Sequence, residues 1–355
     1  MHIDRNRPLQ GIVVGMGGIS RTMLRGLAPF DWYSTCAVVD VQEEALARAQ
    51  ETMALPDHAL FTSLDDALDQ AEADVVLINT PSELHYAQVK AALEAGCHVL
   101  VAKPITNNFE EAVELVEMAA TRQLTLCVGQ QLRFNRHYTA LRRFLATGTL
   151  GGVEMVNFLS AKPRHRALNL KGMDQPVLYE MSCHHFDSLL SLFPDHVPES
   201  IVCDGFRPSW SVYDGPCSVN AMIRFSDDLH LLYHAGFSSQ ADLYELRMEG
   251  ASGALRCRGI HMSNDSMGYE FAARGRPFEP LALDEDMDPI KPWDPFFRQW
   301  RAYLVDGHLE DGESPPFSGR NNLKVFAMLS ASIESVERRM PVAVAGNPRY
   351  AAAFS

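Results

Sequence analysis

Three side chains in this sequence have the types and the spacing needed to move protons. Lys103 stands directly before Pro104 after a short apolar run, where an ammonium group can donate a hydrogen bond to a reacting oxygen. Glu180 and His184 are four residues apart, so on a helix they share one face. The carboxylate would then orient the imidazole and raise its basicity, which leaves the other ring nitrogen free for a substrate proton. These residues predict acid–base chemistry at an alcohol or carbonyl oxygen.

Simpler explanations remain for each of these residues. A lysine near a strand end is often solvated, and a glutamate and a histidine on one helix often form only a local ion pair. Asp187, at i+7 from Glu180, would lie on the same face. Cys183, His184 and His185 raise the alternative of a metal site, but adjacent helical residues point about 100° apart and zinc helices use i, i+4 spacing. We therefore expect no metal.

A glycine-rich turn predicts where a dinucleotide would bind. The segment Gly15-Met16-Gly17-Gly18-Ile19-Ser20 follows an apolar run and matches G-x-G-x-x-G, with Ser20 in the third position. The first glycine allows a tight turn, and the second lets the backbone approach a pyrophosphate at the N-terminus of a helix. A purely structural turn between a strand and a helix is the alternative.

Asp40 indicates which dinucleotide to expect. It ends the next apolar run, 20 residues beyond Ser20, where a carboxylate can accept hydrogen bonds from an adenosine ribose. Residues 41–44 include no arginine to hold a 2′-phosphate. We therefore expect NAD as the cofactor, with NADP less favoured.

The elements around these residues predict a doubly wound α/β domain with a parallel sheet. Between Leu9 and Gly148, short β-branched runs alternate with amphipathic stretches, which is the pattern of βαβ units. We expect strands at 11–14, 36–39, 74–78, 98–101 and 124–128, and helices at 19–28, 42–53, 82–95 and 108–121. Because ligands of such sheets bind outside the carboxyl ends of the strands, we expect Asn79-Thr80-Pro81 and Lys103 to face the ligand.

After Gly151 and Gly152 the pattern changes to alternating polar and apolar residues. This alternation predicts strands of an antiparallel or mixed sheet. The expected strands are 153–158, 219–225, 230–235 and 244–248, and the expected helices are 177–193, 295–305 and 319–339. The fold class is therefore α/β, with a second α/β domain after the first.

Composition and charge exclude several classes of function. The 355 residues carry 31 basic and 45 acidic side chains, a net charge of −14, which repels phosphate backbones and anionic lipid. The longest apolar runs are about five residues, against the roughly 18 to 20 of a membrane helix, and no secretory signal follows Met1. Seven scattered cysteines without a C-x-x-C pair indicate reduced thiols. We expect a cytoplasmic protein that binds neither nucleic acid nor membrane.

In these motifs the sequence resembles the glucose-fructose oxidoreductase, inositol dehydrogenase and MocA (Gfo/Idh/MocA) family over nearly the whole chain. Besides the glycine turn, the similar segments are Asn79-Thr80-Pro81 followed by His85, Ala95-Gly96-Cys97-His98-Val99-Leu100, Lys103-Pro104 in place of E-K-P, Val128-Gly129-Gln130-Gln131-Leu132-Arg133-Phe134 for V-G-F-N-x-R-F, Gly148-Thr149-Leu150-Gly151 for G-x-(I/L)-G, and Asn321-Asn322-Leu323-Lys324. The resemblance implies an NAD(P)-binding Rossmann domain (1–130), an α/β domain whose large open sheet forms a homo-oligomer interface (131–320), and a C-terminal helix and tail packing back near the first domain (321–355).

The resemblance also implies NAD(P)-dependent oxidation or reduction of a sugar, polyol or related carbonyl compound. The family's catalytic lysine falls on Lys103, and its D-x-x-x-H pair falls on Glu180 and His184. Ala102 and Ser182 depart from the family's pattern. Glutamate in place of aspartate at 180 keeps the carboxylate and would move it by about one bond length.

The residues expected at the site fall into two sets. The cofactor set is Gly15, Met16, Gly17, Gly18, Ile19, Ser20, Asp40, Asn79, Thr80, Pro81, His85, Lys103 and Gln131. The substrate set is Lys103, Arg133, Arg164, His165, Glu180, His184 and His185.

We expect the protein to oxidise a secondary alcohol of a sugar, sugar acid or cyclitol, or to reduce the ketone, with His184 as base and Lys103 as donor to the reacting oxygen. The basic run 162–166 could bind a carboxylate or phosphate and is equally typical of a solvated loop, so anionic and neutral substrates stay open. Two other hypotheses remain: a lyase or glycosidase that oxidises its sugar only transiently, and an NAD-binding regulator without turnover. A homo-oligomer, dimer or tetramer, is expected.

Overall fold

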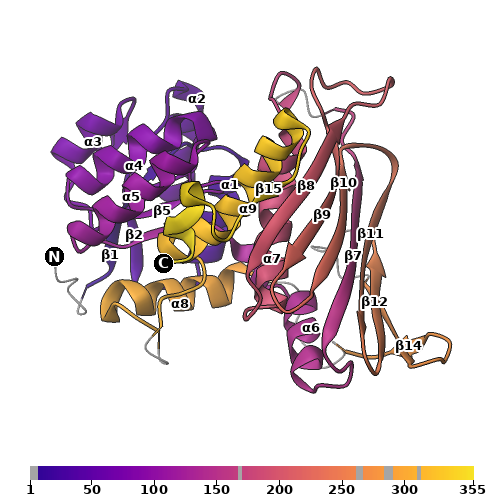
Figure 1. The fold of residues 1–355 in the computed structure, drawn as a ribbon. Helices are drawn as coiled ribbons and strands as arrows, with labels where there is room; N and C mark the ends of the chain where they lie inside the picture. Colours follow the sequence, from indigo (N-terminus) through magenta and orange to yellow (C-terminus); the bar gives the residue numbers. More distant parts are fainter. Residues whose placement is uncertain (1–6, 167–169, 261–266, 284–290, 310–312) are drawn as a thin grey trace. The chain divides into compact units, whose positions relative to one another are not determined.

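The structure is a computed structural model that describes residues 7–166, 170–260, 267–283, 291–309 and 313–355. The chain forms two compact units (Figure 1). The first comprises Met1–Gln131 and Trp293–Leu323, and the second comprises Leu132–Pro292 and Lys324–Ser355. Each unit is therefore made of two separate segments of the chain, and the segments of the two units alternate along the sequence.

The first unit is built on a six-stranded parallel sheet in the order β3-β2-β1-β4-β5-β6. The strands are β1 Leu9–Val14, β2 Tyr33–Val39, β3 Leu60–Phe61, β4 Val75–Ile78, β5 His98–Val101 and β6 Leu126–Val128. Every side chain of β4 is fully buried, as expected for a strand with helices on both faces of its sheet. The strand order reverses between β1 and β4, which is where open α/β sheets bind ligands.

Helices follow the strands of this sheet. They are α1 Gly18–Leu27, α2 Glu43–Met53, α3 Leu64–Gln70, α4 His85–Glu94 and α5 Phe109–Thr121. The side chains of Ser63 and Asn108 cap α3 and α5, each accepting a hydrogen bond from the N–H three residues later. The predicted doubly wound domain is confirmed. The sequence patterns did not reveal β3 or α3, because a two-residue strand and a two-turn helix are too short to show a period.

A helix from late in the sequence completes the first unit. This helix, α8 Trp293–Asp306, contacts α1, where a Cβ on Gly26 would lie only 2.6 Å from Cβ of Trp293. The indole rings of Trp300 and Trp32 are 6.0 Å apart, centroid to centroid. The division thus differs from the expected second domain over 131–320, because burial of these aromatic side chains ties α8 to the first unit.

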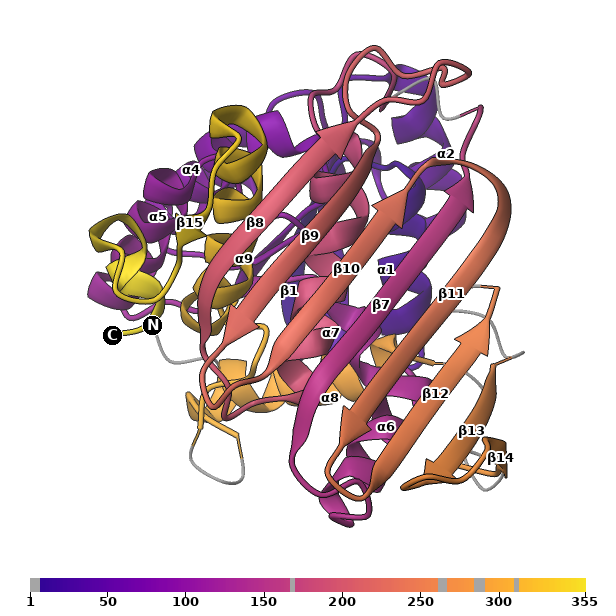
Figure 2. The ribbon, with the colours of Figure 1, turned by 45° about the vertical axis from the view of Figure 1, so that its right-hand side comes forward.

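The second unit is built on a nine-stranded mixed sheet in the order β14-β13-β12-β11-β7-β10-β9-β8-β15 (Figure 2). The strands are β7 Val153–Pro163, β8 Pro198–Phe206, β9 Ser218–Phe225, β10 His230–Gly236, β11 Ser238–Gly250, β12 Gly253–Gly259, β13 Gly268–Ala273, β14 Glu279–Leu281 and β15 Val342–Ala343. Only β7 and β10 run parallel to one another. The expected mixed sheet is confirmed.

The two faces of this sheet have different neighbours. Helices α6 Arg136–Ala146 and α7 Cys183–Leu192 lie on one face, and no described helix covers the other (Figures 1 and 2). Side chains along β9 accordingly alternate between buried and exposed. The covered face holds the core of the unit, and the other face presents side chains outward.

The C-terminal segment joins mainly the second unit. Helix α9 Gly319–Arg338 begins in the first unit and continues in the second. The N–H of Cys203 donates to Oγ of Ser335 at 2.9 Å, and β15 pairs with β8. We expected 321–355 near the first domain, whereas residues from Lys324 onward group with the second because β15 extends the edge of its sheet. Of the described helices, none has the length and hydropathy to cross a bilayer.

Candidate functional site

The glycine turn joins β1 to α1 at the reversal of strand order. Gly15 has φ +81, and a Cβ there would lie 2.9 Å from the carbonyl oxygen of Asn79. Only glycine satisfies both conditions. Ser20 is fully buried, and its hydroxyl donates to the carbonyl oxygen of Gly15. The hydroxyl therefore ties the first turn of α1 to the glycine turn, which accounts for a serine in the third glycine position.

Gly17 borders open space rather than packed atoms. A Cβ on this residue would meet no atom within 4 Å. Helix α1 starts at Gly18 without a side-chain cap from Gly17, so its first N–H groups remain available to an anion. The side chains of Met16 and Ile19, the other two members of the turn, are both partly exposed. This arrangement suits the close approach of a pyrophosphate.

The carboxylate of Asp40 holds the glycine turn. The N–H of Met16 donates to its Oδ2 at 2.7 Å, and the N–H of Gln42 donates to its Oδ1 at 2.9 Å. Each oxygen keeps a further lone pair, so the carboxylate can also accept hydrogen bonds from ribose hydroxyls. A 2′-phosphate beside it would bring like charges together.

His85 connects the loops that follow β4 and β5. Its Nδ1 lies 2.8 Å from the carbonyl oxygen of Pro104, and its Nε2 lies 3.0 Å from that of Thr80. The ring is buried, and burial lowers its pKa. Lys103 precedes Pro104 and is partly exposed. The structure therefore gives His85 a role in positioning the lysine loop, and its direct contact with a cofactor stays a prediction.

Two buried amide oxygens lie at the carboxyl ends of strands in this unit. Oδ1 of Asn79, after β4, and Oε1 of Gln131, after β6, have no hydrogen-bond partner among the described residues. Because buried polar atoms are normally bonded, these oxygens are suited to accept from a bound group. The hydroxyl of Thr80 already donates to Gln88 at 2.5 Å, and Pro81 leads into the short turn Ser82–Leu84. With the open space at Gly17, the residues present fit a dinucleotide.

In the second unit, Glu180 lies in a π turn, Leu178–Ser182, that runs directly into α7. This differs from the uniform α-helix expected over 177–193, because i→i+5 hydrogen bonds widen the turn. The geometry between Glu180 and His184 therefore differs from that of an ideal α-helical i, i+4 pair, and the orienting contact between them stays a prediction. Both side chains are nevertheless partly exposed in a segment that is otherwise largely buried. Single π turns are frequent at functional sites.

His185 belongs to the core of the second unit. Its Nδ1 lies 2.8 Å from the hydroxyl of Tyr233, which donates to Oγ of Ser182 at 2.7 Å. The imidazole also packs 4.6 Å from the ring of Phe158, centroid to centroid. The side chain of His185 is therefore buried against the sheet, and its expected role in substrate binding stays a prediction.

Arg133 and Asp187 form a buried ion pair. Nε of Arg133 lies 3.5 Å from Oδ2 of Asp187, and a guanidinium nitrogen donates to the backbone carbonyl of Asp187 at 3.2 Å. Burial raises the pKa of Asp187 to about 6, against the opposing charges of Arg133 and Arg142. The side chain of Arg133 thus holds α7 from the turn after β6, and its expected substrate contact stays a prediction. Asp187 likewise points inward and does not join the exposed Glu180 and His184.

Arg164 and His165 follow β7 and are partly exposed. The guanidinium carbon of Arg164 lies 4.6 Å from the ring centroid of Phe237, and the hydroxyl of Tyr213 donates to the carbonyl oxygen of Arg164 at 2.9 Å. Burial raises the pKa of Tyr213, Arg164 lowers it, and Glu180 raises it. The charges of Arg164 and Glu180 thus act in opposite directions on the pKa of Tyr213.

The expected site residues are divided between the units. The glycine turn, Asp40 and Lys103 belong to the first, and Glu180, His184 and Arg164 belong to the second.

Sequence patterns did not indicate that Tyr233 and Phe237 contact the predicted site residues His185 and Arg164, since neither aromatic residue belongs to a motif. In the described part of the chain, no three His, Cys, Asp or Glu side chains are grouped to hold a metal ion.

Residues 9–130 match the model of GFO_IDH_MocA, an oxidoreductase family with an NAD-binding Rossmann fold. The chain is 23% identical to myo-inositol 2-dehydrogenase of Thermotoga maritima over 342 residues, which covers 93% of this chain and 97% of that protein. Three uncharacterised oxidoreductases from Schizosaccharomyces pombe and Escherichia coli are 31–33% identical, with the chain spanning 42–46% of their length.

Solved structures resemble the whole chain. An inositol dehydrogenase homologue of Azotobacter vinelandii, in complex with NADH and myo-inositol, gives a TM-score of 0.82 at 18% identity, covering 95% of this chain and 98% of that one. An oxidoreductase of Agrobacterium radiobacter, in complex with NAD⁺, L-tartaric acid and magnesium, gives 0.81 at 14% identity with the same coverage. At these identities the likeness establishes the shared fold.

Proposed function

Because the chain belongs to the Gfo/Idh/MocA family of oxidoreductases, we propose that it oxidises a secondary alcohol of a sugar, sugar acid or cyclitol with NAD, or reduces the corresponding ketone. The observation that carries the proposal is the partial exposure of Glu180 and His184 in a segment otherwise largely buried, which offers a carboxylate and an imidazole to a ligand. The inositol named for the relative from T. maritima and for the neighbour from A. vinelandii supports a polyol-like substrate.

The proposed mechanism uses three residues: a general base, a carboxylate that orients it and a hydrogen-bond donor to the reacting oxygen. His184 accepts the hydroxyl proton of the alcohol, since an imidazole has an ordinary pKa near neutral pH. Glu180 orients the imidazole. Lys103 donates a hydrogen bond to the reacting oxygen and stabilises the negative charge that develops there. In the reverse direction His184 returns the proton to the ketone oxygen.

The cofactor proposed for this reaction is NAD, whose nicotinamide ring, when bound, exchanges hydride with the substrate carbon. The free N–H groups at the start of α1 would bind its pyrophosphate, and Asp40 would accept from the adenosine ribose. The amide oxygens of Asn79 and Gln131 offer further acceptors. The negative charge of Asp40 disfavours the 2′-phosphate of NADP.

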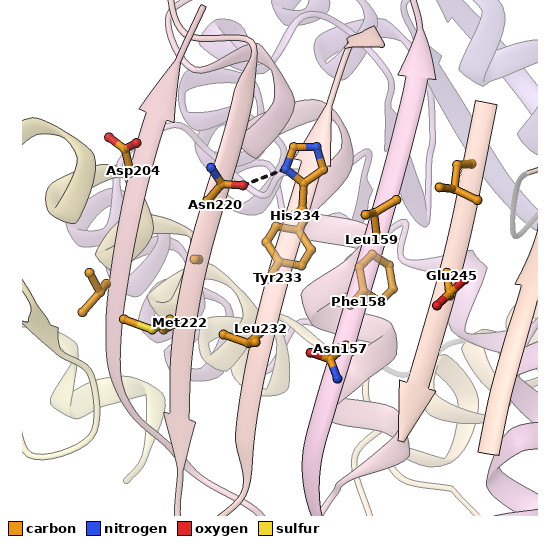
Figure 3. Close-up of a pocket in the computed structure, with 13 residues that line it drawn as sticks. Asn157, Phe158, Leu159, Asp204, Asn220, Met222, Leu232, Tyr233, His234 and Glu245 are labelled. Carbon is orange, nitrogen blue, oxygen red and sulfur yellow. Dashed lines mark hydrogen bonds between the residues drawn. The ribbon is translucent and has the colours of Figure 1, made fainter. Parts of the chain in front are cut away.

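The proposed active form is a homo-oligomer, dimer or tetramer, that uses the uncovered face of the nine-stranded sheet. At the centre of this face, Met155, Met222 and Leu232 are 53–57% exposed, and a cavity of about 550 Å³ lies among the side chains of five strands (Figure 3). Arg224 and Glu245, on the same sheet, already form ion pairs within the chain, with Glu199 and Arg258. A second copy related by a two-fold axis would cover the apolar side chains of this face.

The test is a panel of inositols, neutral sugars and sugar acids, assayed with NAD⁺ and with NADP⁺ while NADH or NADPH formation is followed by absorbance. We expect net NADH formation with at least one compound. Lys103→Met and His184→Ala should each lower kcat about 10²- to 10⁴-fold with NADH binding retained. The partly exposed Lys90, which pairs with Glu114, and the exposed His58 provide the controls Lys90→Met and His58→Ala.

The same assay separates the competing functions. Near wild-type kcat in both Lys103→Met and His184→Ala would exclude the proposed roles. Conversion of a sugar without net NADH formation would identify transient oxidation, as in a lyase or glycosidase. NADH binding without conversion of any compound would identify a regulator.

A further inference from the structure

Arg164 is held firmly but has no acidic partner. Its guanidinium stacks on the ring of Phe237. Its backbone N–H donates to the carbonyl oxygen of Phe237 at 2.9 Å, and its backbone carbonyl oxygen accepts from the hydroxyl of Tyr213. Both aromatic rings are fully buried. Among the described residues, no carboxylate oxygen lies within 4.0 Å of the Arg164 guanidinium. The side chain is therefore positioned before any ligand arrives.

This lack of an acidic partner distinguishes Arg164 from four arginines on the sheet of the second unit. Arg224, Arg247, Arg256 and Arg258 each form an ion pair with a glutamate. The chain carries 45 acidic against 31 basic side chains, so carboxylates are plentiful. A partly buried guanidinium without one is unusual, because buried charges are normally paired. Its planar array of N–H donors matches a carboxylate with two parallel hydrogen bonds.

The surroundings of Arg164 connect it to the proposed substrate site. The hydroxyl of Tyr213 donates to the backbone carbonyl oxygen of Arg164 at 2.9 Å, and the pKa of this phenol is lowered by the charge of Arg164 and raised by that of Glu180. Arg207 donates to the carbonyl oxygen of Tyr213 at 3.3 Å and thereby steadies the loop that carries this tyrosine. Trp210, in the same loop, is 60% exposed and donates from its indole N–H to the carbonyl oxygen of Ser238 at 2.8 Å.

We propose that Arg164 binds the carboxylate of the substrate, so that the enzyme acts on a sugar acid in preference to the neutral sugar. This inference rests on the proposed oxidoreductase function and specifies its substrate class. A singly charged carboxylate matches the two parallel N–H donors of one guanidinium, whereas the second charge of a phosphate dianion would need a further cation. Hydroxyl groups of the same sugar remain for Glu180 and His184.

The test compares the binding of matched ligands by calorimetry, with and without saturating NADH. The pairs are D-glucuronate with D-glucose and D-galacturonate with D-galactose, and D-glucose 6-phosphate is added as a phosphate probe. Wild type should bind at least one acid about 10- to 100-fold more tightly than its neutral partner, the strength expected of charge-assisted hydrogen bonds. The sugar phosphate should show no such advantage.

Two substitutions locate the effect at the guanidinium. Arg164→Met keeps an apolar stem over Phe237 and should remove the preference for the acid while leaving affinity for the neutral sugar unchanged. Arg164→Lys should restore part of the preference. Arg166→Met, an exposed neighbour, serves as the matched control and should bind like wild type. Thermal melting establishes that each variant is folded.

Several results would overturn the inference. One is the absence of detectable acid binding by wild type at millimolar concentration. Another is an acid preference that survives in Arg164→Met, and a third is an equal loss of affinity for acid and neutral sugar in that variant, which would indicate a structural role. Preference for the phosphate would assign Arg164 to a different anion. Failure of NADH to bind would instead count against the proposed oxidoreductase function. It would not decide the role of Arg164, which the ligand comparison without NADH tests separately.

Discussion

Gly15 and Gly17 belong to one turn but are glycine for different reasons. At Gly15 the backbone is left-handed and a Cβ would press on the carbonyl oxygen of Asn79. At Gly17 the backbone is extended, and a Cβ would project into space that no described atom fills. The first glycine is therefore required by folding and the second by ligand binding.

This difference predicts opposite effects of two substitutions. Gly15→Ala should lower the free energy of unfolding by about 1 kcal/mol or more, because alanine resists positive φ and lacks room. Gly17→Val should leave stability within about 0.5 kcal/mol of wild type, and should weaken NADH binding at least about tenfold by filling the space proposed for the pyrophosphate. Denaturant unfolding and titration of NADH fluorescence measure the two effects. Equal loss of stability in both variants would contradict this assignment.

At the scale of elements, α7 is fixed by the ion pair of Arg133 and Asp187, and this pair predicts a dependence of stability on pH. The pKa of Asp187 is raised by burial to about 6 from an ordinary value of 3.8, so the folded state holds this proton more tightly than the unfolded state. The contribution of Asp187 to stability therefore decreases as pH rises from about 4 to 6 and recovers as pH falls.

A variant without this titration isolates its effect. Relative to Asp187→Asn, wild type should gain about 1 kcal/mol of unfolding free energy between pH 7.5 and pH 5. Urea unfolding at the two pH values measures the difference, and Asp195→Asn, at an exposed position just after α7, provides the control. Parallel stabilities of wild type and Asp187→Asn across this range would exclude a raised pKa.

The elements also differ in how visible they are in the sequence. All strands of the first sheet except β3 were predictable because buried strands leave continuous apolar runs. Strands β8, β12, β13, β14 and β15 were not recognised, because their alternation is irregular or, in the two- and three-residue strands, too short to show a period. Helix α6 was missed although its apolar side is buried, because its three arginines and one histidine mask the period.

Prediction of the site shows the same limit. The glycine turn and Asp40 were recognisable because their roles depend on local backbone and short spacing. The environments of Arg133 and His185 depend on partners 54 and 48 residues away, Asp187 and Tyr233. Sequence spacing alone contains no signal for such contacts, so the packing of both residues within the second unit was not predicted, and their proposed substrate contacts stay predictions.

At the scale of the whole molecule, the open sheet face predicts how copies of the chain associate. Met222 and Leu232 are paired neighbours on β9 and β10 at the centre of this face (Figure 3). The double substitution Met222→Asp and Leu232→Asp should convert an oligomer to monomers, because four carboxylates would meet across a two-fold interface. Light scattering on a sizing column measures the mass.

The control for this experiment is Val41→Asp, which changes a side chain that is 83% exposed in the first unit. It should leave the oligomer intact. A wild-type protein that is monomeric at micromolar concentration, or a double variant that keeps the wild-type mass, would exclude the sheet face as the interface.

The interleaved order of the two units has a consequence for synthesis on the ribosome. The parallel sheet emerges first, yet α1 meets Trp293 only after about 160 further residues have been translated, the distance from Gln131 to Trp293 along the chain. Until then the surface around Gly26 and Trp32 lacks its native cover, and the nascent Rossmann unit exposes aromatic side chains. A fragment ending at Gln131 would leave this apolar surface uncovered permanently, because it lacks α8. We therefore expect the first unit to need the later part of the chain in order to fold.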